Sequence, residues 1–234
     1  MLIYGVIKLK SYSMSNNISQ ERKLFFGISR HRMAIDGIGI TTLVGFMGCP
    51  LKCKYCLNEQ CHTSTFKKDD LILRRDIQLL SPKELYDIVK IDNIYFQTTG
   101  GGICFGGGEP IQNHAFIIAF AQLCPTNWKI TLETSLHCSL TTIEALAPYV
   151  NEWIIDIKDM NESIYKQYTG ADSKVVRQLK TIKKCVPIEK ITIKVPHIPH
   201  FNTDEDVKRS IEELQKMGFT NIVETNYIEK RTNI

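Results

Sequence analysis

The sequence predicts an α/β fold, a partial (β/α)6 TIM-like barrel in which parallel strands form a curved sheet. From about residue 24, apolar runs typical of strands alternate with helical patterns, and β-α-β units of this kind give parallel strands with right-handed crossovers. Six such units fit either an open barrel or a doubly wound sheet. Polar motifs follow several successive strands, at the ends where barrels place their chemistry, so the partial barrel is favoured.

Strands and helices are assigned from apolar periodicity and from the residues that bound each run. The predicted strands are residues 41–48, 102–108, 129–135, 153–159, 190–196 and 220–225. The predicted helices are residues 81–91, 111–124, 141–150, 162–168, 173–184 and 203–218. Residues 58–80 show no clear pattern and are expected to form a surface loop beside a group of cysteines.

Capping residues predict the starts of two of these helices. Ser81 is a predicted N-cap, with Pro82 at the first helical position and Glu84 closing a capping box. Thr141 and Glu144 have the same spacing at the start of the third predicted helix. Both helices are therefore expected to begin close to these residues.

The helix predicted over residues 203–218 has the clearest boundaries in the chain. Thr203 or Asp204 is expected to cap it, acidic residues fill its first turn, and Gly218 ends it. One last strand follows this helix. We therefore expect a leader over residues 1–23 and a single domain over residues 24–234.

The composition is that of an ordinary globular protein, with 43% hydrophobic and 23% charged residues among 234. No apolar run reaches the roughly 18 residues of a membrane span, and a net charge of +4 is too mild to argue for nucleic acid or a membrane surface. We expect a cytoplasmic protein with neither as a partner. Thiols stay reduced in that compartment, which favours metal binding over disulfides as the role of clustered cysteines.

Three cysteines, Cys49, Cys53 and Cys56, have C-x3-C-x2-C spacing directly after the first predicted strand. Thiolates this close can converge on one metal centre. A structural zinc site normally has four protein ligands, and Cys61 or His62 is available as the fourth. A 4Fe–4S cluster held by the three cysteines would instead leave one iron free to bind a substrate or cofactor. The spacing alone leaves both interpretations open.

A glycine-rich turn, FGGGEP at residues 105–110, follows the next predicted strand. Consecutive glycines let a ligand approach the backbone closely. Together with the cysteine loop, this turn resembles the radical S-adenosylmethionine (SAM) superfamily, which has CxxxCxxC after the first strand and GGE after the second strand of a partial barrel. The resemblance implies one 4Fe–4S cluster on the three cysteines, with SAM chelating the fourth iron. In this superfamily, reductive cleavage of SAM yields a 5′-deoxyadenosyl radical, which abstracts a hydrogen atom.

The resemblance also implies which residues surround SAM. Gly106, Gly107, Gly108 and Glu109 would line its methionine amino group, and Asn58 would orient the cluster or SAM. The sequence contains no further CxxC motif between the cysteine loop and this turn, so a single cluster is expected.

Within this superfamily, three longer stretches of the sequence resemble the glycyl radical enzyme activating enzymes of the pyruvate formate-lyase activase type. The matching stretches are AIDGIGITTLVGFMGCPLKCKYCLN, WIIDIKDMNESIYKQYTG and ITIKVPHIPHFN, which span about residues 34–224 in the family's order. The resemblance implies abstraction of a glycine hydrogen from a partner, a glycyl radical enzyme or another protein or peptide substrate. It also implies an electron donor such as flavodoxin or ferredoxin.

Carried over to this chain, the resemblance assigns catalytic roles to Asp156, Lys158 and Asp36. Asp156 and Lys158 lie two apart on a predicted strand, so they project from the same side, and both would contact SAM. Asp36 stands in the turn that the family uses near the glycyl loop of its substrate. Glu133 and Thr134 would lie near SAM and a monovalent cation, with glutamate where the family more commonly has aspartate.

Other interpretations stay open at this point. One is a radical SAM reaction on a peptide or on a small molecule such as a deazapurine precursor. Another is a zinc-stabilised binding module, which leaves FGGGEP and IIDIKD without an explanation. The family also carries a Pro-Tyr-His stretch whose histidine contacts SAM, and the corresponding run here, TNYIEKR, has Tyr227 but no histidine.

The remaining cysteines and histidines are interpreted mainly as structural. The sequence predicts core positions for Cys104, Cys124 and Cys185. Cys138 follows a predicted strand and is an alternative candidate for a reactive thiol at the site. Cys61 and His62 are interpreted as bystanders more readily than as extra ligands. His197 and His200 have metal-compatible spacing but are expected in a loop facing substrate or solvent.

Overall fold

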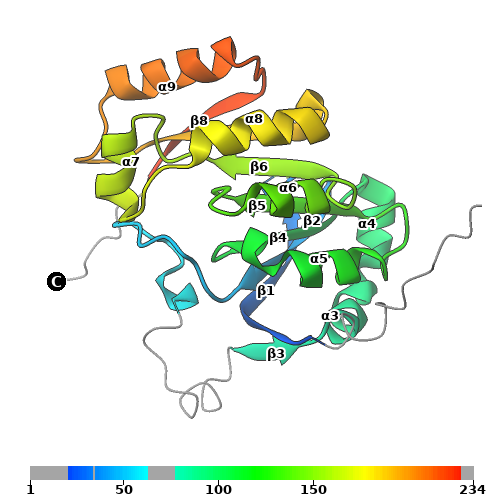
Figure 1. Ribbon diagram of the computed structural model, residues 1–234. Helices are drawn as coiled ribbons and strands as arrows, with labels where there is room; N and C mark the ends of the chain where they lie inside the picture. Colours follow the sequence, from blue (N-terminus) through cyan, green and yellow to red (C-terminus); the bar gives the residue numbers. More distant parts are fainter. Residues whose placement is uncertain (1–20, 34, 63–76, 228–234) are drawn as a thin grey trace, which may run out of the picture.

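A computed structural model describes residues 21–33, 35–62 and 77–227 of the chain. These residues form one eight-stranded sheet with the order β3-β1-β2-β4-β5-β6-β7-β8, which ends at β8 and is therefore open (Figure 1). The parallel strands are β2 (Ile40–Phe46), β4 (Gly102–Gly107), β5 (Lys129–Thr134), β6 (Glu152–Asp156), β7 (Ile191–His197) and β8 (Ile222–Asn226). Two antiparallel strands, β1 (Lys23–Met33) and β3 (Gln78–Leu80), extend the sheet beyond β2.

The six parallel strands are the six that the sequence predicts, so the partial barrel is confirmed. Their neighbours along the chain are also neighbours in the sheet, as expected for successive right-handed crossovers. One predicted boundary is wrong, because residues 153–159 do not all belong to the strand. β6 ends at Asp156, and Lys158 has a left-handed backbone with φ of 62°, which is incompatible with an extended strand.

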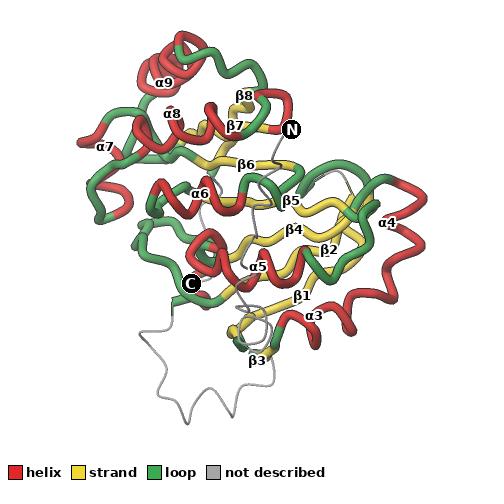
Figure 2. Tube along the Cα trace, turned by 45° about the vertical axis from the view of Figure 1, so that its right-hand side comes forward, coloured by secondary structure: helices red, strands yellow, loops and turns green. Residues whose placement is uncertain are grey.

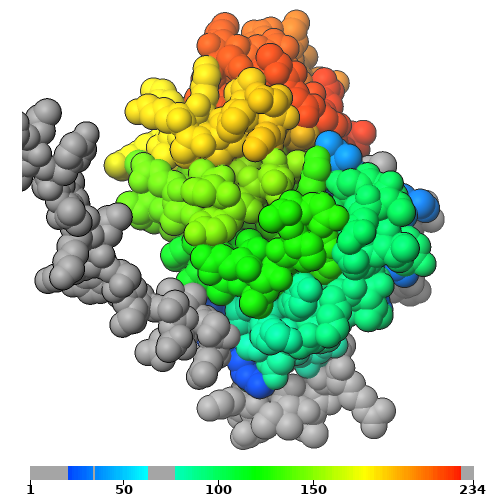
Figure 3. All heavy atoms as spheres, turned by 90° about the vertical axis from the view of Figure 1, so that its right-hand side faces the viewer, coloured from blue at the N-terminus to red at the C-terminus, as the bar shows by residue number. Residues whose placement is uncertain are grey.

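Helices cover the outer face of this sheet. They are α3 (Pro82–Val89), α4 (Asn93–Thr99), α5 (His114–Ala121), α6 (Leu140–Leu146), α7 (Glu162–Thr169), α8 (Val175–Cys185) and α9 (Asp204–Lys216). Short 3-10 turns are η1 (Glu59–Cys61), η3 (Lys90–Asp92), η4 (Pro110–Asn113) and η5 (Ile188–Lys190). Figure 2 shows α5, α6 and α8 side by side in chain order, and Figure 3 shows the same succession from the α3–α4 segment to α9.

Aromatic side chains fill the space between the sheet and these helices. Phe46 of β2 and Phe105 of β4 pack with ring centroids 5.5 Å apart. Phe116 of α5 meets Phe46 edge to face at 5.6 Å, and Phe120 meets Phe105 in the same way at 5.3 Å. Because the apolar side chains of the sheet point toward the helices, the opposite, inner side is left for polar groups.

The observed helix caps test the predicted ones directly. The capping box of Ser81 with Glu84 is present, and Thr203 rather than Asp204 caps α9. The predicted box of Thr141 with Glu144 is wrong. Ser139 is the N-cap of α6, and its hydroxyl accepts from the backbone N–H of Thr142 at 3.3 Å, so Thr141 lies inside the first turn. An earlier serine with extended backbone therefore begins this helix.

The predicted leader over residues 1–23 lies mostly outside the described residues. Lys23 already belongs to β1. The loop expected over residues 58–80 lies partly outside them as well, and its described ends form η1 and β3. Within the described residues, no helix combines the length and apolar character needed to cross a bilayer.

Replacing Thr203 by alanine is expected to lower the free energy of unfolding by about 1 kcal/mol, because it removes the side-chain acceptor of the α9 capping box. Thr181→Ala in the interior of α8 is the matched control, since alanine is a better helix former there. Urea unfolding followed by circular dichroism measures both. Equal stability of Thr203→Ala and the original chain would contradict the role given to this cap.

Candidate active site

A cavity of about 450 Å³ opens on the inner side of the sheet, at the C-terminal ends of the parallel strands. This volume lies within the range of small-molecule binding sites. The predicted site residues that line the cavity are Asp36, Cys49, Cys53, Cys56, Asn58, Gly107, Gly108, Glu109, Glu133, Thr134, Asp156 and Lys158. Gly106 is the exception. It is buried within β4, and a Cβ there would lie 3.1 Å from the Leu43 side chain.

The cysteine loop is fixed to its surroundings by backbone and amide hydrogen bonds. The N–H of Lys52 donates to the carbonyl of Thr169 at 2.8 Å, and that of Lys54 donates to the carbonyl of Tyr168 at 3.1 Å, at the end of α7. On the other side, the Asn58 amide donates to the carbonyl of Gly107 at 3.0 Å. These contacts hold the loop between α7 and the glycine turn.

Three half-buried thiols, those of Cys49, Cys53 and Cys56, face the cavity from this loop. Among the described residues that line the cavity, no other cysteine and no histidine is present. The donor set thus fits a cluster held by three thiolates, with its remaining side turned to the cavity. Gly107 and Gly108 line the same cavity beside these thiols.

The three thiols differ in acidity. Burial raises the pKa of Cys49 to about 12 and that of Cys53 to about 11. A hydrogen bond from Cys61 outweighs burial at Cys56 and lowers its pKa to about 5, with a further contribution from His62. The same hydrogen bond raises the pKa of Cys61. In the metal-free protein at neutral pH, Cys56 is therefore the thiolate of the three.

We expect iodoacetamide to alkylate Cys56 of the metal-free protein at least about tenfold faster than Cys49 or Cys53 at pH 7. Its much larger thiolate fraction outweighs the lower nucleophilicity of a low-pKa thiolate. Because Cys56 is already ionised above pH 6, its rate should stay flat to pH 8, while the rates of the other two rise with pH. Peptide mass spectrometry measures all three, and equal rates would contradict this ordering.

The glycine turn connects the ends of three strands. Gly107 has φ of +92°, a conformation that glycine adopts without strain. The N–H of Gly108 donates to the carbonyl of Phe46 at 3.0 Å, and that of Glu109 donates to the carbonyl of Gly48 at 2.9 Å. The turn therefore lies directly against the end of β2, where the cysteine loop begins.

Glu109 is buried, with 1% of its surface exposed, and burial raises its pKa. Its carboxylate accepts from the hydroxyl of Thr134, from the hydroxyl of Ser135, and from the N–H of Ser135 at 2.9 Å. The N–H of Ile111 donates to it at 3.3 Å. This carboxylate joins the ends of β4 and β5 at the cavity wall.

Charged pairs line the rest of the cavity. The Lys158 ammonium donates to the Asp156 carboxylate at 2.6 Å and to the Tyr227 hydroxyl at 2.6 Å. Burial alone would lower the pKa of Lys158, but Asp156 and Tyr227 together hold it well above its usual range. Lys158 is thus a fixed cation rather than a base, and its left-handed backbone is a strained conformation of the kind found at functional sites.

A second pair, Glu133 on β5 and Lys194 on β7, reaches across β6 with its charged atoms 2.6 Å apart. Burial alone would lower the pKa of Lys194, but Glu133 raises it above its ordinary value. Asp36 is buried and accepts from the guanidinium of Arg32, with the second of two contacts at 3.1 Å. Acidic and basic groups therefore alternate around the cavity, as suits a zwitterionic ligand.

Four polar cavity residues are absent from the sequence-based site: Arg32, Ser135, Lys194 and Tyr227. A signal for Lys194 exists in its strand, because its neighbours Ile193 and Val195 are buried toward the helices and Lys194 must point the other way. Tyr227 stands in the run TNYIEKR that departs from the family pattern, and its contact with Lys158 places it at the cavity.

The remaining thiols and imidazoles lie outside the cavity lining. Cys104 is buried in the core as predicted, whereas Cys185 is exposed at the end of α8, so its core assignment is wrong. Its thiol donates to the carbonyl of Thr181 on the solvent side of that helix. Burial raises the pKa of Cys138 to about 12, which does not suit a reactive thiol.

His197 and His200 do not form a metal group in the structure. His197 contacts Asp204 and Glu224 at 3.2 Å each. His200 has φ of 65°, a left-handed conformation that favours glycine. Among the described residues, the group of side chains that can hold a metal ion is instead Cys56, Cys61 and His62.

The fold and cavity together define a class of protein: an open α/β barrel enzyme with a three-thiol metal centre at the C-terminal ends of its strands. The chain belongs to the radical SAM superfamily, whose family model matches residues 43–228. The superfamily uses a 4Fe–4S cluster held by three cysteines together with SAM, and these are the cofactors of this protein.

Several curated relatives share modest identity with the chain. The isethionate sulfite-lyase activating enzyme of Oleidesulfovibrio alaskensis is 26% identical over 74% of this chain and 74% of its own length. The (2S)-3-sulfopropanediol dehydratase activating enzyme of Klebsiella oxytoca is 26% identical over 77% and 73%. The pyruvate formate-lyase-activating enzyme of Clostridium pasteurianum is 29% identical over 58% and 53%.

Solved structures share the fold. SuiB from Streptococcus suis, bound to S-adenosylmethionine, has a TM-score of 0.57 at 18% identity and covers 80% of this chain. The structure of anSMEcpe with bound AdoMet has a TM-score of 0.54 at 19% identity and also covers 80%. The chain spans only 40% and 52% of these two proteins, so the likeness extends to the barrel fold alone.

Proposed function

We propose that this protein is a glycyl radical enzyme activating enzyme, which abstracts a hydrogen from a glycine Cα of a protein partner. The observation that carries the proposal is the similarity to curated relatives that are named as activating enzymes. The alignments cover about three quarters of this chain and of each relative. The cavity supports it, because its thiols and charged pairs occupy successive strand ends in the order of the activase motifs. When bound, the reduced cluster supplies the electron that cleaves SAM to a 5′-deoxyadenosyl radical.

The charged pairs of the cavity are proposed to orient SAM. Lys158, kept cationic by Asp156 and Tyr227, suits the methionine carboxylate or the ribose oxygens. Glu133 faces the cavity beside Lys194 and offers a carboxylate to an ammonium group or a monovalent cation. Gly107 and Gly108 line the cavity, and their backbone is proposed to face the methionine end of SAM.

The partner is proposed to enter as an extended glycine-containing segment. The cavity wall includes Ile35 and Leu57, whose side chains are 60% and 55% exposed, so its rim is apolar. Exposed apolar groups beside a functional cavity suit contact with another protein. Asp36, buried by its pair with Arg32 near Ile35, is proposed to orient that segment through the turn that carries it. The electron donor is proposed to be a flavodoxin or a ferredoxin.

Anaerobic mixing of the reconstituted, reduced protein with SAM and a glycyl radical protein from the same genome tests this function. We expect a glycine-centred doublet in the EPR spectrum of the partner and stoichiometric 5′-deoxyadenosine. A variant of the partner with alanine at the radical glycine is the control. SAM cleavage without a doublet from any such partner would contradict the activase proposal and favour a peptide or small-molecule substrate.

A further inference from the structure

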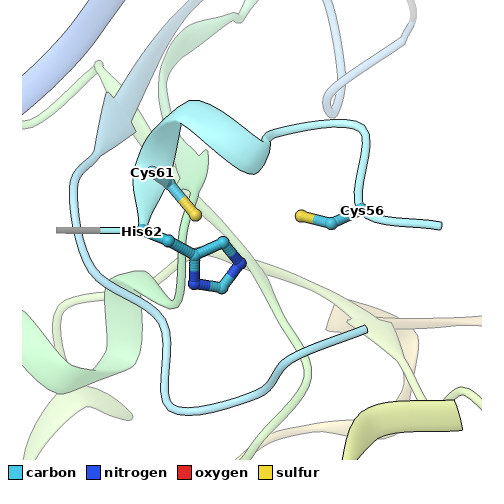
Figure 4. Close-up of side chains that lie close together, drawn as sticks. All are labelled: Cys56, Cys61 and His62. Atoms are coloured by element: carbon cyan, nitrogen blue, oxygen red, sulfur yellow. The ribbon is translucent and has the colours of Figure 1, made fainter. Parts of the chain in front are cut away.

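The side chains of Cys56, Cys61 and His62 point toward one another. This group differs from the cysteine triplet that is assigned to the iron–sulfur cluster. Its two sulfurs and one ring nitrogen all lie within 4.8 Å of one another. Figure 4 shows both sulfurs and the imidazole ring turned toward the same space. Cys56 also lines the SAM cavity, whereas Cys61 and His62 do not, so Cys56 is common to two sites.

The η1 turn brings Cys61 and His62 back beside Cys56. Within it, the N–H of Cys61 donates to the carbonyl of Asn58 at 2.8 Å, and that of His62 donates to the carbonyl of Glu59 at 3.1 Å. The turn is fixed at both ends by hydrogen bonds. The Asn58 amide donates to the carbonyl of Gly107, and the N–H of Gly48 donates to the carbonyl of Cys61 at 2.6 Å. A metal ion would therefore meet ligands that are largely held in position already.

We propose that Cys56, Cys61 and His62 bind a single zinc ion, and that zinc and the iron–sulfur cluster exclude each other because both require Cys56. Two thiolates and an imidazole are ligands that zinc prefers, and three protein ligands leave a fourth position for water. Binding releases the protons of any ligand thiol that is not already ionised to solvent. The exclusion rests on the proposed assignment of Cys56 to the cluster, whereas zinc binding itself does not.

The two sites give the protein a cluster-free resting form. With zinc bound, Cys56 is held against Cys61 and His62, and the cavity keeps only the thiols of Cys49 and Cys53. Two cysteines are fewer than the three that the cluster uses in this superfamily, so assembly must wait until zinc leaves. Zinc availability would thereby control how much of the protein carries a cluster.

Titration of the reduced, metal-free full chain with Co²⁺, followed by competition with Zn²⁺, tests the first part. We expect one tightly bound Co²⁺ with thiolate charge-transfer bands and tetrahedral d–d bands in the original chain and in Cys53→Ala. In Cys61→Ala and His62→Ala, affinity should fall at least about 100-fold, since losing a direct ligand costs more than the 10–100-fold typical of losing its hydrogen-bond partner.

The variants separate this site from the cluster cysteines. Loss of Co²⁺ binding in Cys53→Ala would overturn the proposal, because the metal would then sit on the cysteine triplet. Unchanged affinity in His62→Ala would overturn it as well, and this variant leaves the buried Cys61 thiol in place. The Co²⁺ titration and the Zn²⁺ competition need neither SAM nor a partner protein, so their outcome is independent of the activase function.

Cluster assembly in the presence of zinc tests the exclusion. Each protein is loaded with one equivalent of Zn²⁺, and the visible absorbance that grows on adding iron and sulfide is compared with its own zinc-free assembly. Zinc should suppress assembly in the original chain and in Cys185→Ser, a control at an exposed thiol far along the chain, and should have little effect in His62→Ala. Full assembly with zinc still bound would overturn the exclusion.

Discussion

Cys53→Ala is expected to abolish both the iron–sulfur cluster and SAM cleavage. Cys53 is one of three thiols that face the cavity, and among the described lining residues no other cysteine or histidine can replace it. After anaerobic reconstitution, the variant should lack the broad visible absorbance of the cluster and give no 5′-deoxyadenosine above background. Iron and sulfide per chain, absorbance and product are measured together.

Cys185→Ser is the matched control, because this thiol is exposed at the end of α8 and lies outside the cavity. It should assemble the cluster and cleave SAM as the original chain does. A Cys53→Ala protein that still carries four irons per chain and cleaves SAM would show that other side chains hold the cluster.

Gly108→Ala is expected to separate the glycine turn from the cysteine loop. A Cβ at this position would lie 2.1 Å from the carbonyl oxygen of Gly48 and 2.9 Å from that of Phe46, and both obstacles are backbone. Overpacking costs typically 1–3 kcal/mol, and the upper end applies because neither carbonyl can move aside by a rotamer change. For a chain of this size we expect the melting temperature to fall by about 6–12 °C, together with poor cluster assembly.

Gly27→Ala is the control for this substitution, since a Cβ there would meet no heavy atom within 4 Å. It should leave the melting temperature within about 2 °C of the original, as expected for a surface change below 0.5 kcal/mol. Differential scanning calorimetry measures both variants. A Gly108→Ala protein as stable as Gly27→Ala would contradict the close contact described between the two loops.

The parallel core could be predicted because most of its strands carry buried apolar residues and end in a polar motif. In β5, for example, Leu132 is fully buried, and Glu133 and Thr134 follow at the end of the strand. Because successive β-α-β units align these ends, the cysteine loop, the glycine turn and Asp156 could be assigned to one side of the sheet.

The antiparallel edge could not be predicted from such patterns. In β1 only Phe25 is buried, and the strand carries charged residues, a glycine and His31 with φ of 56°. α4 was missed for a different reason. Its residues include β-branched and aromatic types with modest helix propensity, and the helix is stabilised by burial of Phe96, which meets Trp128 edge to face at 4.8 Å.

Site residues that belong to a sequence motif could be predicted. Residues such as Lys194 and Tyr227, which reach the site through contacts with distant parts of the chain, could not. Lys194 and Glu133 lie on strands that are separated by β6. They still form an ion pair, because both side chains point to the inner side of the sheet and reach across β6. Tyr227 reaches the cavity because it directly follows β8, where its N–H donates to the carbonyl of His197 at 3.1 Å and its hydroxyl accepts from Lys158. Neither relation follows from spacing along the chain. Gly106 belongs to the motif, but strand geometry buries it below the cavity.

The most direct test of the account is the EPR spectrum of the reduced, reconstituted protein with and without SAM. We expect a 4Fe–4S signal whose shape changes when SAM is added, because one iron would lack a protein ligand and face the cavity. Tyr227→Phe should keep that response, since Lys158 retains Asp156. A colourless protein that binds zinc alone, or a cluster signal that SAM leaves unchanged, would contradict the claim that the three thiols hold an open-iron cluster beside a SAM site.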